Sequence, residues 1–197
     1  MKKICLISFV VVLLYACKSE PDMERTIFVP DEEDATLPAY TEWGYNSFGA
    51  EYEREYFLAS QRIVPCKIMY DVNNNQLRFS LHGTRSAAEM TLEFIFPVEQ
   101  MTDYKDLAKL HDVKIDLAVV DCTVKIWQGE NETVLDVLNG ELHFKRTQLL
   151  YVDDQVNRVI LSGTFDLRFM QRGFPTNISY GRFDLGMNNR YFTINNF

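Results

Sequence analysis

The stretch that decides the fold is Arg158–Met170, which reads RVILSGTFDLRFM. From Val159 to Phe169 every second residue is apolar or glycine, and the residues between them are mostly polar. A β-strand turns successive side chains to opposite faces, so this pattern predicts a strand with one packed face and one wet face. Purely parallel sheets show unbroken apolar runs and intervening helices instead, so the alternation favours antiparallel pairing.

Further strands and turns follow on both sides of this stretch. The same period of two recurs in three shorter runs, at Gln76–His82, Met90–Phe96 and Glu141–Lys145. Asn139-Gly140 is the strongest short hairpin signal in the chain, because both residue types tolerate a positive φ. Three other turns are expected, at Asn73–Asn75, Gln128–Asn131 and Gln171–Pro175.

One segment departs from the period of two. Met101–Leu110 carries apolar residues near helical spacing, and Thr102 and Asp103 are candidates for its cap. We expect a short helix here that closes an open end of the β structure or crosses between sheets. The predicted fold class is therefore all-β, a single antiparallel β-sandwich or barrel of about ten strands with one short helix.

The N-terminus has the features of a bacterial lipoprotein signal. Lys2 and Lys3 precede an uncharged run, Ile4–Tyr15, which at 12 residues is too short to span a bilayer as a helix. Ala16-Cys17 then resembles the end of a lipobox, in which the cysteine becomes the lipidated N-terminus. We expect residues 1–16 to be a signal peptide and Cys17 to be the lipidation site, so that the protein meets the membrane through its N-terminal lipid.

Residues 17–39 are predicted to be an acidic flexible tether, followed by a β domain over residues 40–197. The tether contains many acids and few large apolar residues, so it has little to bury on folding. Glu20 and Asp22, just after the predicted lipidated cysteine, resemble surface-export signals of Bacteroidetes lipoproteins. The resemblance implies an outer-membrane lipoprotein on the cell surface or the periplasmic face.

Three stretches resemble a family of lipid-anchored Bacteroidetes cell-envelope proteins of unknown function. Thr41–Gly49 reads TEWGYNSFG and matches the pattern T-x-x-G-x-N-x-F-G, while Ser162–Phe165 and Gly181–Asp184 match its S-G-T-F and G-R-F-D strands. The resemblance implies an all-β envelope domain and brings no catalytic residues with it. We interpret these motifs as structural: Gly49 and Gly163 allow a bulge or close packing, and Arg182 and Asp184 share one strand face.

Composition and motifs name no activity. The chain has 197 residues and a formal net charge of −8, which argues against a nucleic-acid partner. The three histidines lie in no metal-binding spacing, and there is no nucleophile elbow or phosphate-binding glycine loop. Asp71–Asn75 resembles the start of a calcium loop but lacks the glycine and the glutamate that such a loop needs, so we interpret it as a turn. No cofactor and no enzymatic activity are predicted.

Four side chains are kept as candidates for a site or a cross-link. Trp43 and Trp127 could stack on a sugar ring or a partner protein, or could pack under a loop or against the helix. Cys66 and Cys122 both have inward strand parity, and the cell envelope permits a disulfide between them. Two buried free thiols are the favoured alternative, because cysteine packs as a small apolar residue.

Three functions remain open. The first is a non-catalytic, lipid-anchored envelope protein that acts as a binding or accessory module, with a glycan or an envelope protein as its partner. The second is a carrier of a small apolar ligand with a calycin-like barrel, and the third is a polymer hydrolase. A filled core would favour the binding module, and an empty apolar interior would favour the carrier. A polar cleft would favour the hydrolase.

Overall fold

The computed structural model describes residues 25–60 and 64–195, so the predicted signal peptide, Cys17 and the first part of the predicted tether lie outside it. The described chain forms one sheet of twelve strands and one short helix. The strands are β1 (Ser47–Tyr52), β2 (Glu55–Ala59), β3 (Cys66–Asp71), β4 (Gln76–Arg85), β5 (Ala88–Pro97), β6 (Val113–Asp116), β7 (Thr123–Gln128), β8 (Asn131–Val134), β9 (Asp136–Val152), β10 (Gln155–Gln171), β11 (Phe174–Met187) and β12 (Phe192–Asn195).

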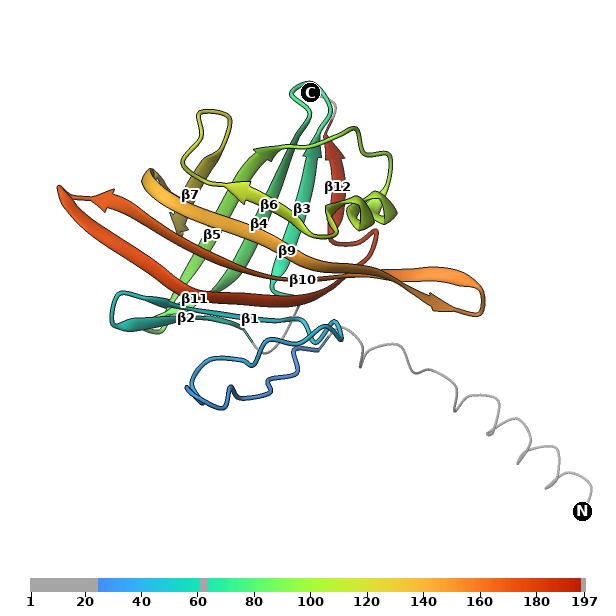
Figure 1. Cartoon of the computed structure of the whole chain (residues 1–197), viewed down its shortest axis with the longest axis horizontal. Helices are drawn as coiled ribbons and strands as arrows, with labels where there is room; N and C mark the ends of the chain where they lie inside the picture. The colour runs from blue at the N-terminus through green and yellow to red at the C-terminus, as the bar shows by residue number, and fades with distance from the viewer. Residues whose placement is uncertain (1–24, 61–63, 196–197) are drawn as a thin grey trace, which may run out of the picture.

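The sheet curls so that its two halves face each other. Its strand order is β6-β9-β10-β11-β1-β2-β4-β5-β7-β8, with β3 paired to β4 and β12 paired to β3. In Figure 1, β9, β10 and β11 cross in front of β3, β4 and β5 at a steep angle. Within the described residues β6 and β8 do not pair, so the sheet is not closed into a barrel. The prediction of an all-β, sandwich-like fold is confirmed; one pairing, β12 with β3, is parallel rather than antiparallel.

The alternation of β10 produces the core as predicted. Its inward side chains, from Val159 to Phe169, are at most 2% exposed, and Gly163 lies among them. Four phenylalanine rings fill the space between the two halves of the sheet, with ring centroids 5.2 to 6.1 Å apart: Phe79, Phe94, Phe144 and Phe183. Tilted and edge-on contacts at this spacing are favourable for aromatic rings. The interior is therefore packed with side chains.

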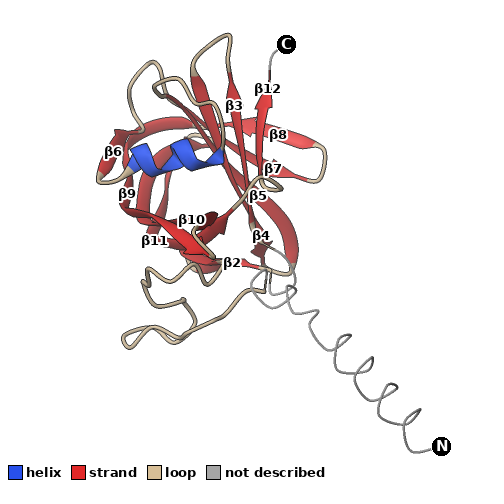
Figure 2. Ribbon diagram, turned by 90° about the vertical axis from the view of Figure 1, so that its right-hand side faces the viewer, coloured by secondary structure: helices blue, strands red, loops and turns tan. Residues whose placement is uncertain are grey.

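The predicted helix is present as the 3₁₀ helix η2 (Tyr104–Leu110). Asp103 is its N-cap, and the Asp106 carboxylate completes a capping box. Leu107 and Leu110 are buried, and the Thr147 hydroxyl of β9 donates a hydrogen bond to the Ala108 carbonyl at 2.8 Å. Figure 2 shows the helix lying across one end of the curled sheet, as the sequence predicted.

The turns expected at Asn73–Asn75, Gln128–Asn131 and Gln171–Pro175 are confirmed. The hairpin predicted at Asn139-Gly140, which had the strongest local signal, is wrong. Strand β9 runs through Asn139-Gly140 without reversing, and its pairing with β10 shifts register there. A Cβ atom on Gly140 would lie 2.6 Å from the Asp166 carbonyl oxygen, so glycine serves a close backbone approach at a bulge. The preference of Asn-Gly for a turn is overridden because β9 pairs with β10 on both sides of this point.

The segment before Tyr40 differs from the prediction of a flexible tether. Over residues 25–39 it lies against the sheet: the Ile27 amide donates to the Tyr45 carbonyl at 2.8 Å, and Leu37 is buried. Two of the acids that favoured a solvated coil have partners: Asp31 forms an ion pair with Arg182, and Asp34 accepts a hydrogen bond from Tyr56. Backbone amides of this same segment lower the pKa of Asp31. These contacts form across long sequence separations that composition does not reveal.

No helix in the stretches 25–60 and 64–195 combines the length and the apolar character that a bilayer crossing needs.

Candidate functional site

The two ends of the predicted family motif meet at one buried carboxylate, that of Asp184 on β11. The side chain is 1% exposed. Its hydrogen-bond donors are the Thr41 hydroxyl at 2.6 Å, the amides of Trp43, Gly44 and Tyr45 at 3.0, 2.8 and 3.2 Å, and the Ser162 hydroxyl at 2.9 Å. With five donors and almost no exposed surface, this carboxylate holds the segment 41–45 on the sheet and leaves no room for a ligand.

Asn46 completes the same attachment. Its side-chain oxygen accepts a hydrogen bond from the Gly186 amide at 2.9 Å, and its backbone adopts a positive φ of 54°. Asparagine tolerates this conformation better than most residues. The segment therefore covers the outer side of β10, and this is why Ile160 and Ser162 are buried although their strand parity predicts a wet face.

Trp43 and Trp127 line two separate hollows that share no residue. Trp43 is 72% exposed and borders a hollow of about 220 Å³ beside Ile27 and Tyr45. Trp127 is half-buried on the outer face of β7 and borders a larger groove of about 340 Å³, here called the Trp127 groove. Its lining residues are Lys67, Met69, Arg78, Ser80, His82, Thr91, Glu93, Trp127 and Gly129.

Strand register explains the chemistry of the Trp127 groove. Thr91 on β5 lies opposite Trp127 on one side and opposite His82 on the other, so these three side chains form one row across the sheet. The imidazole Nδ1 of His82 lies 2.9 Å from the Thr91 hydroxyl. Burial, with a smaller contribution from the Lys67 charge, lowers the pKa of His82, which favours a neutral ring that can both donate and accept a hydrogen bond.

Glu93 adds an acceptor to the same groove. Ser80 lies opposite Glu93 and donates a hydrogen bond to its Oε2 atom at 3.1 Å. The Oε1 atom is buried and has no partner among the described residues. A buried carboxylate oxygen without a donor is costly, so a ligand hydroxyl group that displaced its neighbours and reached this oxygen would be stabilised there. The sequence showed that Ser80 and His82 share a strand face. Only the register of β5 against β4 showed that Glu93 and Thr91 lie opposite them.

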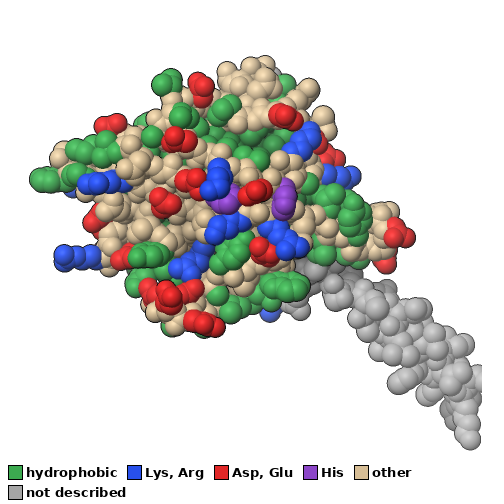
Figure 3. Space-filling view, viewed as in Figure 1, with side chains coloured by type: hydrophobic (Ala, Val, Ile, Leu, Met, Phe, Trp, Pro, Cys, Tyr) green, Lys and Arg blue, Asp and Glu red, His purple; other side chains and the backbone are tan. Residues whose placement is uncertain are grey.

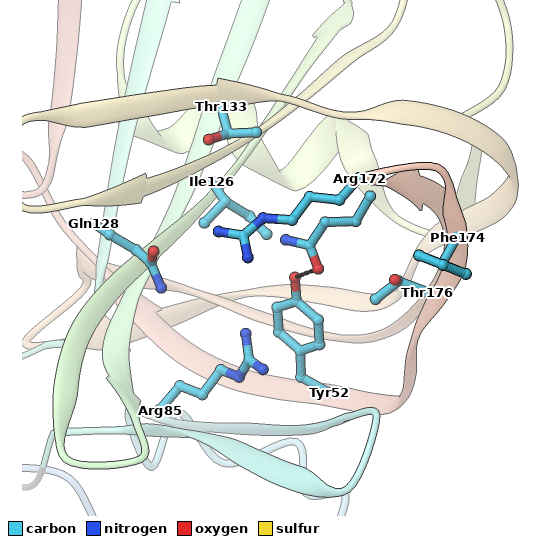
Figure 4. Close-up of a pocket in the computed structure, with 9 residues that line it drawn as sticks. Tyr52, Arg85, Ile126, Gln128, Thr133, Arg172, Phe174 and Thr176 are labelled. Atoms are coloured by element: carbon cyan, nitrogen blue, oxygen red, sulfur yellow. Dashed lines mark hydrogen bonds between the residues drawn. The ribbon is translucent and has the colours of Figure 1, made fainter.

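A second large hollow opens where the β10–β11 hairpin passes the ends of β1, β4 and β7, far from η2 (Figure 1). This hollow, here called the arginine pocket, has a volume of about 410 Å³ and is drawn in Figure 4. Its lining residues are Tyr52, Arg85, Ile126, Gln128, Thr133, Gln171, Arg172, Phe174 and Thr176. Sequence reasoning missed it because its residues come from six strands and a turn.

Apolar side chains are also exposed at the tips of the two long hairpins. Tyr151 and Val152 lie at the end of the β9–β10 hairpin, and Phe174 lies beside the turn of the β10–β11 hairpin. On the face in Figure 3, acidic and basic side chains are interspersed over the middle and hydrophobic side chains gather toward the two ends. This mixture of charges leaves no broad patch of one sign on that face.

The two cysteines within the described residues are free thiols, the alternative that the sequence favoured. Cys66 is buried in the core as its parity predicted, and burial raises the pKa of its thiol. Cys122 is half-buried. The described part of the chain contains no cluster of three or more histidine, cysteine or acidic side chains that could hold a metal ion.

No protein-family model, curated protein or solved structure matches this chain. Fold and surface together describe an all-β protein with a packed interior and several surface hollows, among them the Trp127 groove and the arginine pocket.

Proposed function

We propose that this protein is a non-catalytic, lipid-anchored cell-envelope protein that binds carbohydrate in the Trp127 groove. The observation that carries the proposal is the combination of an indole ring with a row of polar side chains and a partnerless Glu93 oxygen in one groove. Protein sites for sugars commonly combine these two features. The C–H face of the sugar ring stacks on an aromatic side chain, and the sugar hydroxyl groups need hydrogen-bond donors and acceptors. His82, Ser80 and Glu93 supply both.

The same groove favours binding over glycoside hydrolysis. Hydrolysis of a glycosidic bond generally uses two carboxyl groups on either side of the scissile bond. Glu93 is the one acidic side chain among the residues that line the groove. A carrier of apolar ligands is disfavoured by a different observation, since phenylalanine rings occupy the interior where such a ligand would have to lie.

Trp127→Ala is expected to weaken carbohydrate binding by about tenfold, because the stacking surface is lost while the polar row remains. The measurement is isothermal titration of the purified full-length protein with mannan, dextran and xylan. Trp43→Ala is the matched control and should keep the affinity of the parent protein. Equal binding by the Trp127→Ala variant, with an unchanged melting temperature, would refute the site; failure of all three glycans to bind the parent would refute the proposal.

Cys17→Ser is expected to move the protein from the membrane fraction to the soluble fraction. Each buried CH₂ group of an acyl chain contributes about 0.8 kcal/mol to membrane binding, so several chains on one cysteine hold a protein firmly. Cell fractionation followed by immunoblotting measures the change, and Cys122→Ser is the control because it removes a thiol outside the predicted lipobox. A Cys17→Ser protein that still sediments with membranes after a salt wash would contradict the anchor.

A further inference from the structure

The arginine pocket is lined by basic and neutral side chains on a protein whose net charge is negative. The whole chain carries a formal net charge of −8, yet none of the nine side chains that line this pocket is acidic, and two of them are arginines. In Figure 4 the guanidinium groups of Arg85 and Arg172 reach into the hollow from opposite walls. Two like charges that face one hollow repel each other, and an anion between them would relieve that repulsion.

Arg85 is held in place by its neighbours. Its guanidinium group lies 3.6 Å from the centroid of the Tyr52 ring, and its Nε atom forms an ion pair with Glu55 at 2.6 Å. The ring covers one face and Glu55 takes one edge, so the two Nη groups are the donors left for a ligand. Such a pre-positioned guanidinium loses little freedom when it binds an oxyanion.

Arg172 approaches from the hairpin. It occupies the first position of the two-residue turn between β10 and β11, where Arg172 and Gly173 both have a positive φ. This turn type aligns the two strands and places the arginine at the rim of the pocket. Among the residues that the structure describes, Arg172 has no acidic partner. Its whole fork of donors is therefore available.

The remaining polar atoms extend the donor set. Tyr52 donates its hydroxyl to the side-chain oxygen of Gln171, which also lines the pocket, at 3.2 Å, so the Gln171 amide nitrogen is not used by this hydrogen bond. Gln128 and Thr133 line the side opposite this pair. The exposed ring of Phe174 adds an apolar edge at the mouth.

We propose that the arginine pocket binds a sugar-sized ligand that carries one oxyanion group, held between the Arg85 and Arg172 guanidinium groups. Arginine forks match carboxylate and phosphate oxygens with paired hydrogen bonds, and amides and hydroxyls suit the neutral remainder of such a ligand. The pocket volume of about 410 Å³ is in the lower part of the range of roughly 300–1,000 Å³ for small-molecule sites. This site is separate from the Trp127 groove and does not depend on the function proposed for it.

Titration with three matched sugars tests the proposal and identifies the source of the oxyanion. Glucuronate, glucose 6-phosphate and glucose differ at one carbon only, and each is titrated into the purified full-length protein at low salt. We expect at least one of the two anions to bind and glucose not to bind. Binding of glucuronate alone would assign a carboxylate, binding of glucose 6-phosphate alone would assign a phosphate, and the absence of binding by both would overturn the proposal.

Variants locate the binding. Arg172→Gln should weaken binding of the anion at least about tenfold, since a charged pair of hydrogen bonds is lost. Arg168→Gln is the matched control, because Arg168 is an exposed arginine on the outer face of β10, the strand that leads into the Arg172 turn, and its replacement changes the net charge equally. An equal loss in both variants would show a general charge effect and overturn the site. Trp127→Ala should leave anion binding unchanged, which separates this test from that of the carbohydrate groove.

Discussion

Asp184→Ala is expected to lower the free energy of unfolding by about 4 kcal/mol, the largest loss we expect from any single polar side chain in this protein. Removal of the carboxylate leaves three backbone amides and two hydroxyls without their acceptor at a buried position. Unsatisfied buried donors lose the full stabilisation of their hydrogen bonds to water. Urea unfolding of the full-length protein, followed by tryptophan fluorescence, measures the change.

Asp184→Asn should cost less, about 2 kcal/mol, for a geometric reason. The Oδ2 atom accepts three hydrogen bonds and the Oδ1 atom accepts two, one of them from the Ser162 hydroxyl. An asparagine can place its amide nitrogen at the Oδ1 position, where Ser162 can turn and accept. Only the Gly44 amide then loses its partner.

Asp166→Asn on β10 is the control for the Asp184 variants. Burial and the nearby charge of Glu141 raise the pKa of Asp166, which means that its charged form is disfavoured in the folded protein. A neutral asparagine should therefore cause no loss of stability at pH 7. If Asp184→Ala unfolds at the same urea concentration as the parent and as Asp166→Asn, the Asp184 cluster does not hold the fold.

Gly163→Val should destabilise the protein by at least about 3 kcal/mol, because it forces extra atoms into a closed part of the core. A Cβ atom at this position would lie 2.1 Å from the His143 carbonyl oxygen and 2.5 Å from the Phe183 ring. Both neighbours are constrained, since one is the backbone of the paired strand and the other belongs to the central ring cluster. The melting temperature of the full-length variant reports the effect.

Gly129→Asn is the matched control for Gly163→Val. Gly129 lies in the β7–β8 turn with a φ of +61°, and nothing lies within 4 Å of a Cβ atom built there. Asparagine tolerates this conformation, so its melting temperature should stay close to that of the parent. A Gly163→Val variant that melts with the control would mean that the core at this point has free space.

Local patterns predicted much of the architecture. The period of two in β10 identified the side chains that face the core, and the capping residue Asp103 was found because it begins a short segment with a different period. Gly163 was expected to permit a bulge or close packing, and β9 shifts register beside it. These features depend on a few neighbouring residues, and strand geometry or capping relates them directly to structure.

Structural features that depend on contacts between residues far apart in the sequence could not be predicted. Asn139-Gly140 has every local mark of a hairpin, yet the pairing of β9 with β10 along its length makes it a bulge. The motif that contains Asp184 was interpreted as structural, but the sequence did not indicate that the Thr41 and Ser162 hydroxyls both donate hydrogen bonds to the Asp184 carboxylate. Residues 25–39 looked too acidic to fold, because the arginine and tyrosine that pair with them come much later in the sequence.

The chain by itself determined the fold class, singled out two tryptophans worth testing and predicts an N-terminal anchor signal, because each follows from composition or from spacings of a few residues. The tertiary structure alone decided that Trp127 borders a groove lined mainly by polar side chains while Trp43 borders a smaller, mostly apolar hollow, and that Arg85 and Arg172 line one pocket. A ligand site is a convergence of side chains in space. Strand register and sheet curvature bring these residues together, and both result from pairings across the whole domain.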